Sequence, residues 1–197
     1  MSQIKLLHSG GNGVSIVAPD SNPASDRTLK LPSDGDSTID TLSRAGNILQ
    51  VKQTVKLDSF STTSTTAVDI TGLSVDITPT STSSKILVMV SLPMGNDDAN
   101  FTYGVLKRGS TQLGEADGAS NRPRPTYMAY DSNEGILHMV SFTFLDSPNT
   151  TSATTYKMQL QCASTGTATV GKSFRDNDNV GHDPRMSSTI TVMEVAA

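Results

Sequence analysis

Apolar and polar residues alternate in short runs from Ile48 onward, a pattern typical of β-strands. In the first run Leu49, Val51, Val55 and Leu57 alternate with polar residues, which predicts one buried and one solvated face. The run 86–90 is apolar throughout and predicts a central strand covered on both faces. Further strands are expected at 68–77, 101–105, 136–145, 156–162, 168–170 and 189–195.

Turn-forming residues separate these runs. The alternation changes phase at Thr71-Gly72, which predicts a bulge or bend there. Arg108-Gly109-Ser110 is typical of a hairpin turn that returns through Leu113. The segments 115–125 and 176–183 are polar and predict loops. Because no long amphipathic helix interrupts the strands, we predict an all-β fold, an antiparallel β-sandwich of the jelly-roll-like kind.

The first 46 residues differ from the rest of the chain and predict a separate N-terminal segment, 1–46, before a sandwich domain, 47–197. Two short strands and one short helix over 37–45 are expected there, with a loop as the alternative to the helix. Such elements bury too little apolar surface to offset the ordering of the chain, so they need a partner or remain a disordered tail. The candidate assembly residues are the apolar positions Val14, Ile16, Leu29, Leu31, Ile39 and Leu42.

Composition narrows the possible partners. The net charge is −4, without a broad excess of Lys and Arg, so we expect no nucleic-acid partner and no insertion into a membrane. The chain has 26 Ser and 25 Thr, residue types that favour strands and turns. Its single cysteine, Cys162, continues the apolar face of a strand, which predicts a buried free thiol.

Residue patterns that indicate catalysis or metal binding are weak. His182-Asp183 lies near Asp176 and Asp178, but the segment has Val180 where a calcium loop needs a ligand, and a solvated turn is expected. The chain has no P-loop and no Gly-x-Ser-x-Gly motif. The carboxylates of Asp131, Glu134 and Asp146 follow no pattern that pairs them for glycoside hydrolysis. We therefore expect no catalytic residue, no metal site, no cofactor and no enzyme activity.

One segment, 121–130, combines side chains suited to recognition of a surface. It carries arginines and tyrosines beside two stiff prolines, a combination that favours binding of carbohydrate or protein. In the alternative interpretation the tyrosines begin a strand and the arginines are only solvated. The candidate receptor-binding residues are Arg122, Arg124, Tyr127 and Tyr130.

Several segments resemble the fibre and virion structural proteins of bacteriophages, in particular of aquatic phages. The N-terminal part of the resemblance is carried by Gly10-Gly11-Asn12-Gly13-Val14-Ser15-Ile16-Val17-Ala18-Pro19 and by 22–32. The sandwich part is carried by 45–51, 71–75, 83–88, 145–157 and 188–194, so that the resemblance spans nearly the whole chain.

This resemblance implies a homotrimeric fibre on a phage virion that attaches the particle to its host. The N-terminal segment would join other virion proteins or form an intertwined stem, and the sandwich would be the exposed knob that contacts a host glycan or protein. The protein would be made in the host cytoplasm and located on the tail or the capsid surface. Because the sequence has no shaft repeat, the fibre is expected to be short. A capsid decoration protein or head fibre, and a stand-alone carbohydrate-binding module, are the alternatives.

Overall fold

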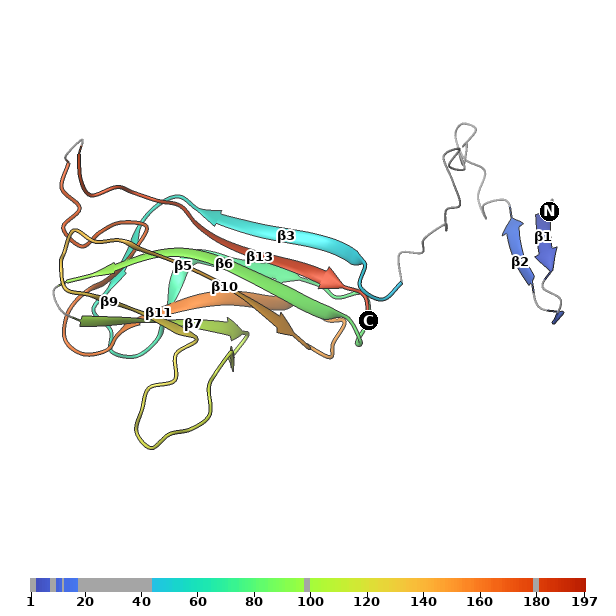
Figure 1. The fold of residues 1–197 in the computed structure, drawn as a ribbon, viewed down its shortest axis with the longest axis horizontal. Helices are drawn as coiled ribbons and strands as arrows, with labels where there is room; N and C mark the ends of the chain where they lie inside the picture. Colours follow the sequence, from blue (N-terminus) through green and yellow to red (C-terminus); the bar gives the residue numbers. More distant parts are fainter. Residues whose placement is uncertain (1–2, 8–9, 12, 18–43, 98–99, 179–180) are drawn as a thin grey trace. The chain divides into compact units, whose positions relative to one another are not determined.

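The chain forms two compact units, Met1–Ile39 and Asp40–Ala197. A computed structural model describes residues 3–7, 10–11, 13–17, 44–97, 100–178 and 181–197. In the first unit β1 (Gln3–Leu7) and β2 (Gly13–Val17) pair as an antiparallel hairpin, with Leu6 opposite Val14 and Ile4 opposite Ile16 (Figure 1). The strand expected around Val14 and Ile16 is confirmed, and β1 was not expected. The candidate assembly residues Leu29, Leu31, Ile39 and Leu42, and most of the expected helix, lie outside the described residues.

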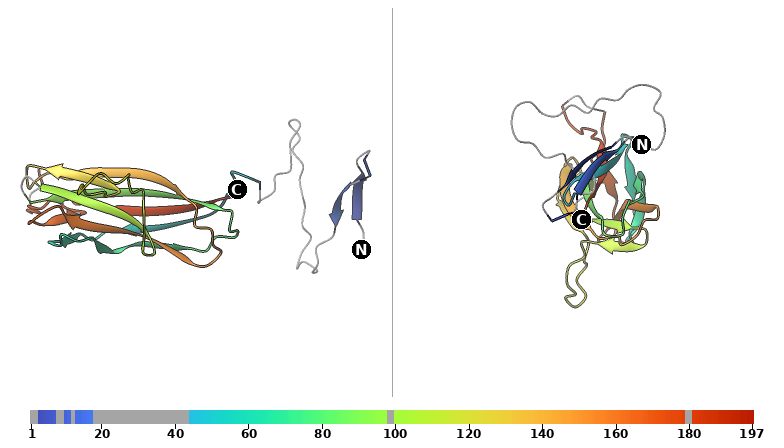
Figure 2. Two further views of the ribbon diagram at one scale, coloured as in Figure 1. Left: turned by 90° about the horizontal axis from the view of Figure 1, so that it is seen from below. Right: turned by 90° about the vertical axis from the view of Figure 1, so that its right-hand side faces the viewer.

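The second unit consists of strands joined by turns and loops, and every strand pair is antiparallel (Figures 1 and 2). This confirms the all-β sandwich predicted from the alternation of apolar and polar residues. The strands are β3 (Ile48–Lys56), β4 (Phe60–Thr62), β5 (Val68–Ile77), β6 (Lys85–Asn96), β7 (Asn100–Arg108), β8 (Thr111–Leu113), β9 (Tyr127–Asp131), β10 (His138–Asp146), β11 (Thr154–Cys162), β12 (Ala168–Val170) and β13 (Ser188–Val195).

At three places in the sheets, two strands follow one another along the same neighbouring strand and together form one interrupted strand. These pairs are β12 with β13, β4 with β3, and β8 with β9. β12 and β13 both pair with β6, while β4 pairs with β12 and β3 with β13. In the same way β8 and β9 both pair with β7. The first sheet therefore runs β10, β6, β12/β13, β4/β3, and the second runs β5, β11, β7, β8/β9. This order, in which the chain crosses repeatedly between two four-stranded sheets, is that of a jelly roll.

The core lies between the two sheets and is built by residues at alternate positions of their strands. On β6 the side chains of Ile86, Val88 and Leu92 are fully buried, and on β11 those of Tyr156 and Leu160. The bulge predicted at Gly72 is confirmed, because the register between β5 and β11 shifts there and Gly72 has a φ of 80°. Cys162 is a buried free cysteine, as predicted.

Two strands of the first sheet depart from the predicted pattern of burial. On β3 the apolar side points outward, with Val51 52% and Val55 49% exposed, whereas Lys56 on the polar side is buried. The polar side faces β5, where Thr54 Oγ1 donates a hydrogen bond to the carbonyl oxygen of Ser74 at 2.7 Å. Within the run 86–90, central strand β6 is covered on one face only, since Met89 is 39% exposed on the other. The expectations of a buried apolar face on β3 and of two covered faces on β6 were therefore wrong.

Two buried carboxylates brace the sandwich from within. Asp146 on β10 accepts hydrogen bonds from Arg108 on β7 and from the hydroxyl of Tyr156 on β11, and so links the two sheets. Glu194 on β13 is fully buried and accepts hydrogen bonds from Gln50 on β3 and from the backbone and side chain of Thr80. Buried polar atoms that are satisfied in this way fix how the sheets pack against each other.

Candidate functional site

The loop 114–126 is an insertion between β8 and β9 that projects from the second sheet (Figure 1). Thr126 anchors its return to the sheet. The Thr126 backbone amide donates to the carbonyl of Gly104 at 3.0 Å, and its hydroxyl donates to the carbonyl of Leu113 at 2.9 Å. That hydroxyl also accepts a hydrogen bond from the Leu106 amide at 2.9 Å. The loop is therefore held at its base, and it places Arg122 and Arg124 above the outer face of β7.

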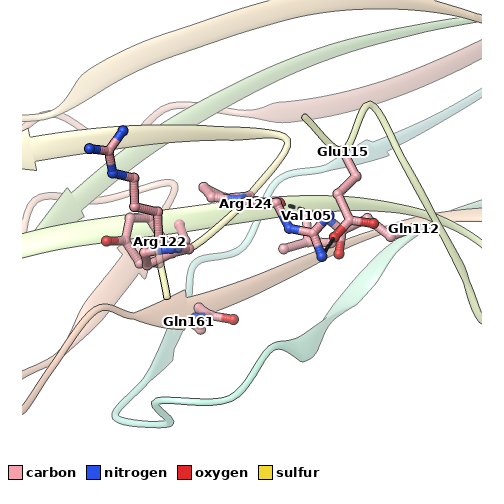
Figure 3. Close-up of a pocket in the computed structure, with 9 residues that line it drawn as sticks. Val105, Gln112, Glu115, Arg122, Arg124 and Gln161 are labelled. Carbon is pink, nitrogen blue, oxygen red and sulfur yellow. Dashed lines mark hydrogen bonds and ion pairs between the residues drawn. The ribbon is translucent and has the colours of Figure 1, made fainter. Parts of the chain in front are cut away.

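A pocket of about 300 Å³ lies between this loop and the outer face of the second sheet (Figure 3). It joins residues of the loop to residues of β7, β8 and β11, so its wall combines guanidinium, amide, carboxylate and aromatic groups. The sequence identified Arg122 and Arg124 as candidate binding residues but not the strand residues of the pocket. Those residues come close together only because segments distant in sequence pair, as Gln161 does with Tyr103. The pocket is lined by Tyr103, Val105, Gln112, Glu115, Arg122, Pro123, Arg124, Pro125 and Gln161.

The two arginines of the pocket have different surroundings. Arg124 forms an ion pair with Glu115 at 2.8 Å and donates to the carbonyl of Ala116 at 3.3 Å, while its own carbonyl accepts from Gln112 at 2.6 Å. Arg124 therefore stabilises the loop. Arg122 is exposed, and within the described parts of the chain no carboxylate forms an ion pair with it. In Figure 3 its side chain points away from the Arg124–Glu115 pair.

Three aromatic rings on the outer face of β7 and β9 extend this pocket. Phe101 lies 6.4 Å from Tyr103 and 4.8 Å from Tyr130, measured between ring centroids. Phe101 is 37% and Tyr130 48% exposed. We call Phe101, Tyr103 and Tyr130 the aromatic patch. Because Tyr103 belongs to both the pocket and the patch, the two form one continuous surface.

Tyr127 does not belong to this exposed surface, although the sequence analysis grouped it with Tyr130. Its ring packs against the core at 4.9 Å from Phe142, in space left open by the missing side chain of Gly104. Its hydroxyl is buried with no hydrogen-bond partner among the described residues, and this burial raises the pKa of the phenol. Alternation along β9 explains the difference, since Tyr127 shares its side of the strand with buried Ala129 whereas Tyr130 lies on the other side.

The loop between β12 and β13 is held by ion pairs. Asp176 pairs with Arg185 at 2.8 Å and with Lys172 at 3.2 Å, and Asp183 pairs with Arg175 at 2.9 Å. Asp176 and Asp183, near His182, are thus bound to arginine and lysine. Across the described ranges no three His, Cys, Asp or Glu side chains come together as a metal site would need.

Acid is expected to loosen this loop. The hydrogen bond from Arg185 holds the pKa of Asp176 below its ordinary value of 3.8, and that from Arg175 does the same for Asp183. A carboxylate whose pKa is lowered by folding stabilises the fold above its ordinary pKa, and this contribution is lost as the pH falls through the lowered value. Hydrogen exchange of residues 173–176, corrected for intrinsic rates, should therefore accelerate below pH 3.8. An Asp176→Asn variant should show the fast exchange already at neutral pH, and equal protection in both proteins would contradict this account.

The outer face of the first sheet differs from the pocket, because three neighbouring rows of its residues contain no charged side chain. One row of neighbouring residues, Val51, Met193, Leu87 and Leu145, crosses all four strands. Val51 and Leu145 are 52% and 56% exposed. The next two rows contain hydroxyl, amide and apolar side chains, and none of the three rows contains a charge. We call these twelve residues the charge-free face: Val51, Gln53, Val55, Leu87, Met89, Ser91, Ser141, Thr143, Leu145, Thr189, Thr191 and Met193.

Comparison with known proteins gives only distant likenesses. No protein-family model and no curated protein matches the chain. A structure of the Gt strain of infectious bursal disease virus is similar at 14% identity and a TM-score of 0.39, over 95% of this chain and 48% of that one. A VP2 subviral particle of the same virus matches at 12% identity and a TM-score of 0.37, over 87% of this chain and 42% of that one. This chain thus spans about half the length of these proteins, and TM-scores of this size assign it neither a family nor a role.

Among the residues that the structure describes, none forms a helix long and apolar enough to cross a bilayer.

Proposed function

We propose that this protein is a structural component of a phage virion, a short homotrimeric fibre on the tail that attaches the particle to the host surface and has no enzyme activity. The observation that carries the proposal is the charge-free face, an exposed sheet surface with an apolar row across all its strands. Monomeric proteins rarely expose contiguous apolar surface, which marks sites of protein contact. The resemblance of the sequence to phage fibre proteins supports the viral part of the proposal.

The occupants that we propose for the charge-free face are the other two copies of this chain in the trimer. Three such faces directed at a common threefold axis pack without desolvating an ion, which favours self-association over a charged partner. The charge-free face spans four strands and five residues of each strand, about 19 Å by about 17 Å, or roughly 320 Å² before side-chain relief is counted. That is less than half of the ~800 Å² per partner of a standard interface. Completion of the β1–β2 hairpin by other subunits would add to this area, since a two-stranded hairpin alone is only marginally stable.

Light scattering after size-exclusion chromatography tests the trimer. The full chain should have three times the 20.8 kDa mass of one chain at micromolar concentration. Val51→Glu combined with Leu145→Glu places two charges in the apolar row and should give a folded monomer, because a buried unpaired charge disrupts an interface. Met128→Glu changes a similarly exposed residue on the other sheet and should remain trimeric. A monomeric wild-type chain would contradict the proposal.

A capsid decoration protein or head fibre is the second candidate, favoured by the jelly-roll strand order. Jelly rolls occur in viral capsid domains as well as in lectin domains, so the fold suits both locations. Labelling of virions with an antibody against this chain, followed by electron microscopy, distinguishes the two. Label at the tail supports the fibre, and label distributed over the capsid supports the decoration protein.

A further inference from the structure

We propose that the pocket beneath the 114–126 loop binds a saccharide that carries a carboxylate. In this proposal the guanidinium of Arg122 binds the carboxylate and the aromatic patch contacts the sugar rings. The inference rests on the proposed attachment function and names the class of its ligand. It depends on three properties of the pocket, which are its charge, its neutral polar groups and its rigidity.

The charge of the pocket favours an anion. Glu115 is the only acid in its wall, and Arg124 neutralises it in an ion pair of 2.8 Å. Arg122 therefore leaves one positive charge that no described carboxylate compensates. A guanidinium presents two parallel N–H groups that match the two oxygens of a carboxylate, so Arg122 is suited to a bidentate contact. One uncompensated cation in the pocket wall, in a chain of net charge −4, is far too little for a nucleic-acid backbone.

The neutral groups of the pocket favour a sugar over a simple anion. The wall contains the amides of Gln112 and Gln161 and the phenol of Tyr103, which offer both donors and acceptors to hydroxyl groups. Beside them the rings of Phe101 and Tyr130 are partly exposed and provide an apolar platform for the C–H face of a pyranose. A hollow of about 300 Å³ is at the small end of ligand pockets and suits one sugar ring, with a second ring over the aromatic patch.

The pocket is also organised before any ligand binds. Pro123 and Pro125 restrict the backbone on both sides of Arg124, and three hydrogen bonds of Thr126 fix the base of the loop. The Glu115–Arg124 ion pair and the Gln112 hydrogen bond hold the two sides of the loop together. A loop that is already ordered loses little entropy on binding, so modest contacts with a saccharide are sufficient.

The test uses the full chain and two pairs of probes, each an acidic saccharide and its neutral methyl ester. Tri-galacturonic acid is compared with its methyl ester, and 3′-sialyllactose with its methyl ester, by saturation-transfer NMR and titration calorimetry. At least one acidic probe should bind ten-fold or more tightly than its neutral counterpart. Arg122→Gln should abolish this preference, Arg122→Lys should retain part of it, and Tyr130→Ala should weaken binding of the acidic probe.

The controls separate this site from general electrostatics and from the proposed function. Lys52→Gln removes a positive charge that is also exposed, from the other sheet, and should bind as the wild type does. Four results would each overturn the proposal. The first two are equal affinity for the acid and its ester, and an Arg122→Gln variant whose preference for the acid is unchanged. The others are no binding of either acid at millimolar concentration, and binding of tri-glutamate that is as tight as that of the acidic saccharides. Light scattering on the same samples measures the mass of the assembly independently of ligand binding. Failure of the ligand assignment can therefore be distinguished from failure of the fibre assignment.

Discussion

Replacing Asp146 with alanine is expected to lower the free energy of unfolding by about 3–5 kcal/mol, the usual cost of breaking a buried ion pair. Asp146 is only 5% exposed, and both its oxygens lie 2.8 Å from Nη1 of Arg108. The hydroxyl of Tyr156, on a fully buried side chain, donates to the same carboxylate at 2.6 Å. Without Asp146 this buried hydroxyl loses its acceptor, and the Arg108 guanidinium keeps only the carbonyl oxygen of Ser147 at 3.2 Å. Urea unfolding followed by circular dichroism measures the loss.

Asp76→Ala is the matched control for this experiment. Asp76 is also a strand aspartate that accepts a hydrogen bond, from Thr155, but it lies on the exposed side of β5. Its replacement should change the free energy of unfolding by less than about 1 kcal/mol, as is usual for surface pairs. Equal effects of the two substitutions would show that the Asp146 cluster does not brace the sheets.

Replacing Glu194 with alanine is expected to be similarly damaging, with a loss of about 3–5 kcal/mol, because a cavity and several unsatisfied donors are created together. Thr80 donates twice to Oε1 at 2.7 Å and Gln50 donates to Oε2 at 2.6 Å. Glu194→Gln keeps the volume but turns one acceptor into a donor that faces other donors, so about half of the loss should remain. Urea unfolding at neutral pH measures both variants. Glu115→Gln, in an exposed ion pair, is the control and should be nearly neutral.

The lowered pKa of Glu194 also predicts how the free energy of unfolding depends on pH. Burial alone would raise the pKa of Glu194, but hydrogen bonds from Gln50, Thr80 and Ser84 outweigh it and hold the pKa below the ordinary value of 4.5. A carboxylate with a lowered pKa contributes stability above its ordinary pKa and loses that contribution as the pH falls through the lowered value. The difference in stability between wild type and Glu194→Gln should therefore be full at neutral pH and shrink below pH 4.5. A difference that stays constant in acid would contradict this account of the Glu194 hydrogen bonds.

Alternation of apolar and polar residues was sufficient to predict most strands of the second unit and much of its core, but not the short strand β4. Tyr156, Met158, Leu160 and Cys162 alternate in the sequence and are all buried on β11. The phase change at Gly72 likewise marked the bulge in β5. These features follow from the two-residue period of a strand, which is a local property of the chain.

Alternation could not tell which side of a strand would face the core. On β3 the polar side turns inward, because Gln50 lies beside buried Glu194 and Thr54 satisfies a backbone carbonyl of β5. The apolar side is consequently exposed and forms part of the charge-free face. Which face is buried depends on the neighbouring strands, and the order of the strands cannot be predicted from any local sequence pattern.

By itself the sequence determined the fold class, most strand positions of the second unit, the buried thiol and the loop that carries Arg122 and Arg124, because each depends on residues close together in the chain. Only the tertiary structure decided that Tyr127 belongs to the core and Tyr130 to the surface, and that Gln161 and Tyr103 complete a pocket with Arg122. It also aligned Val51, Met193, Leu87 and Leu145 into one row. These arrangements arise from pairing between segments far apart in sequence, and the register of that pairing is fixed by the packing of the whole sandwich.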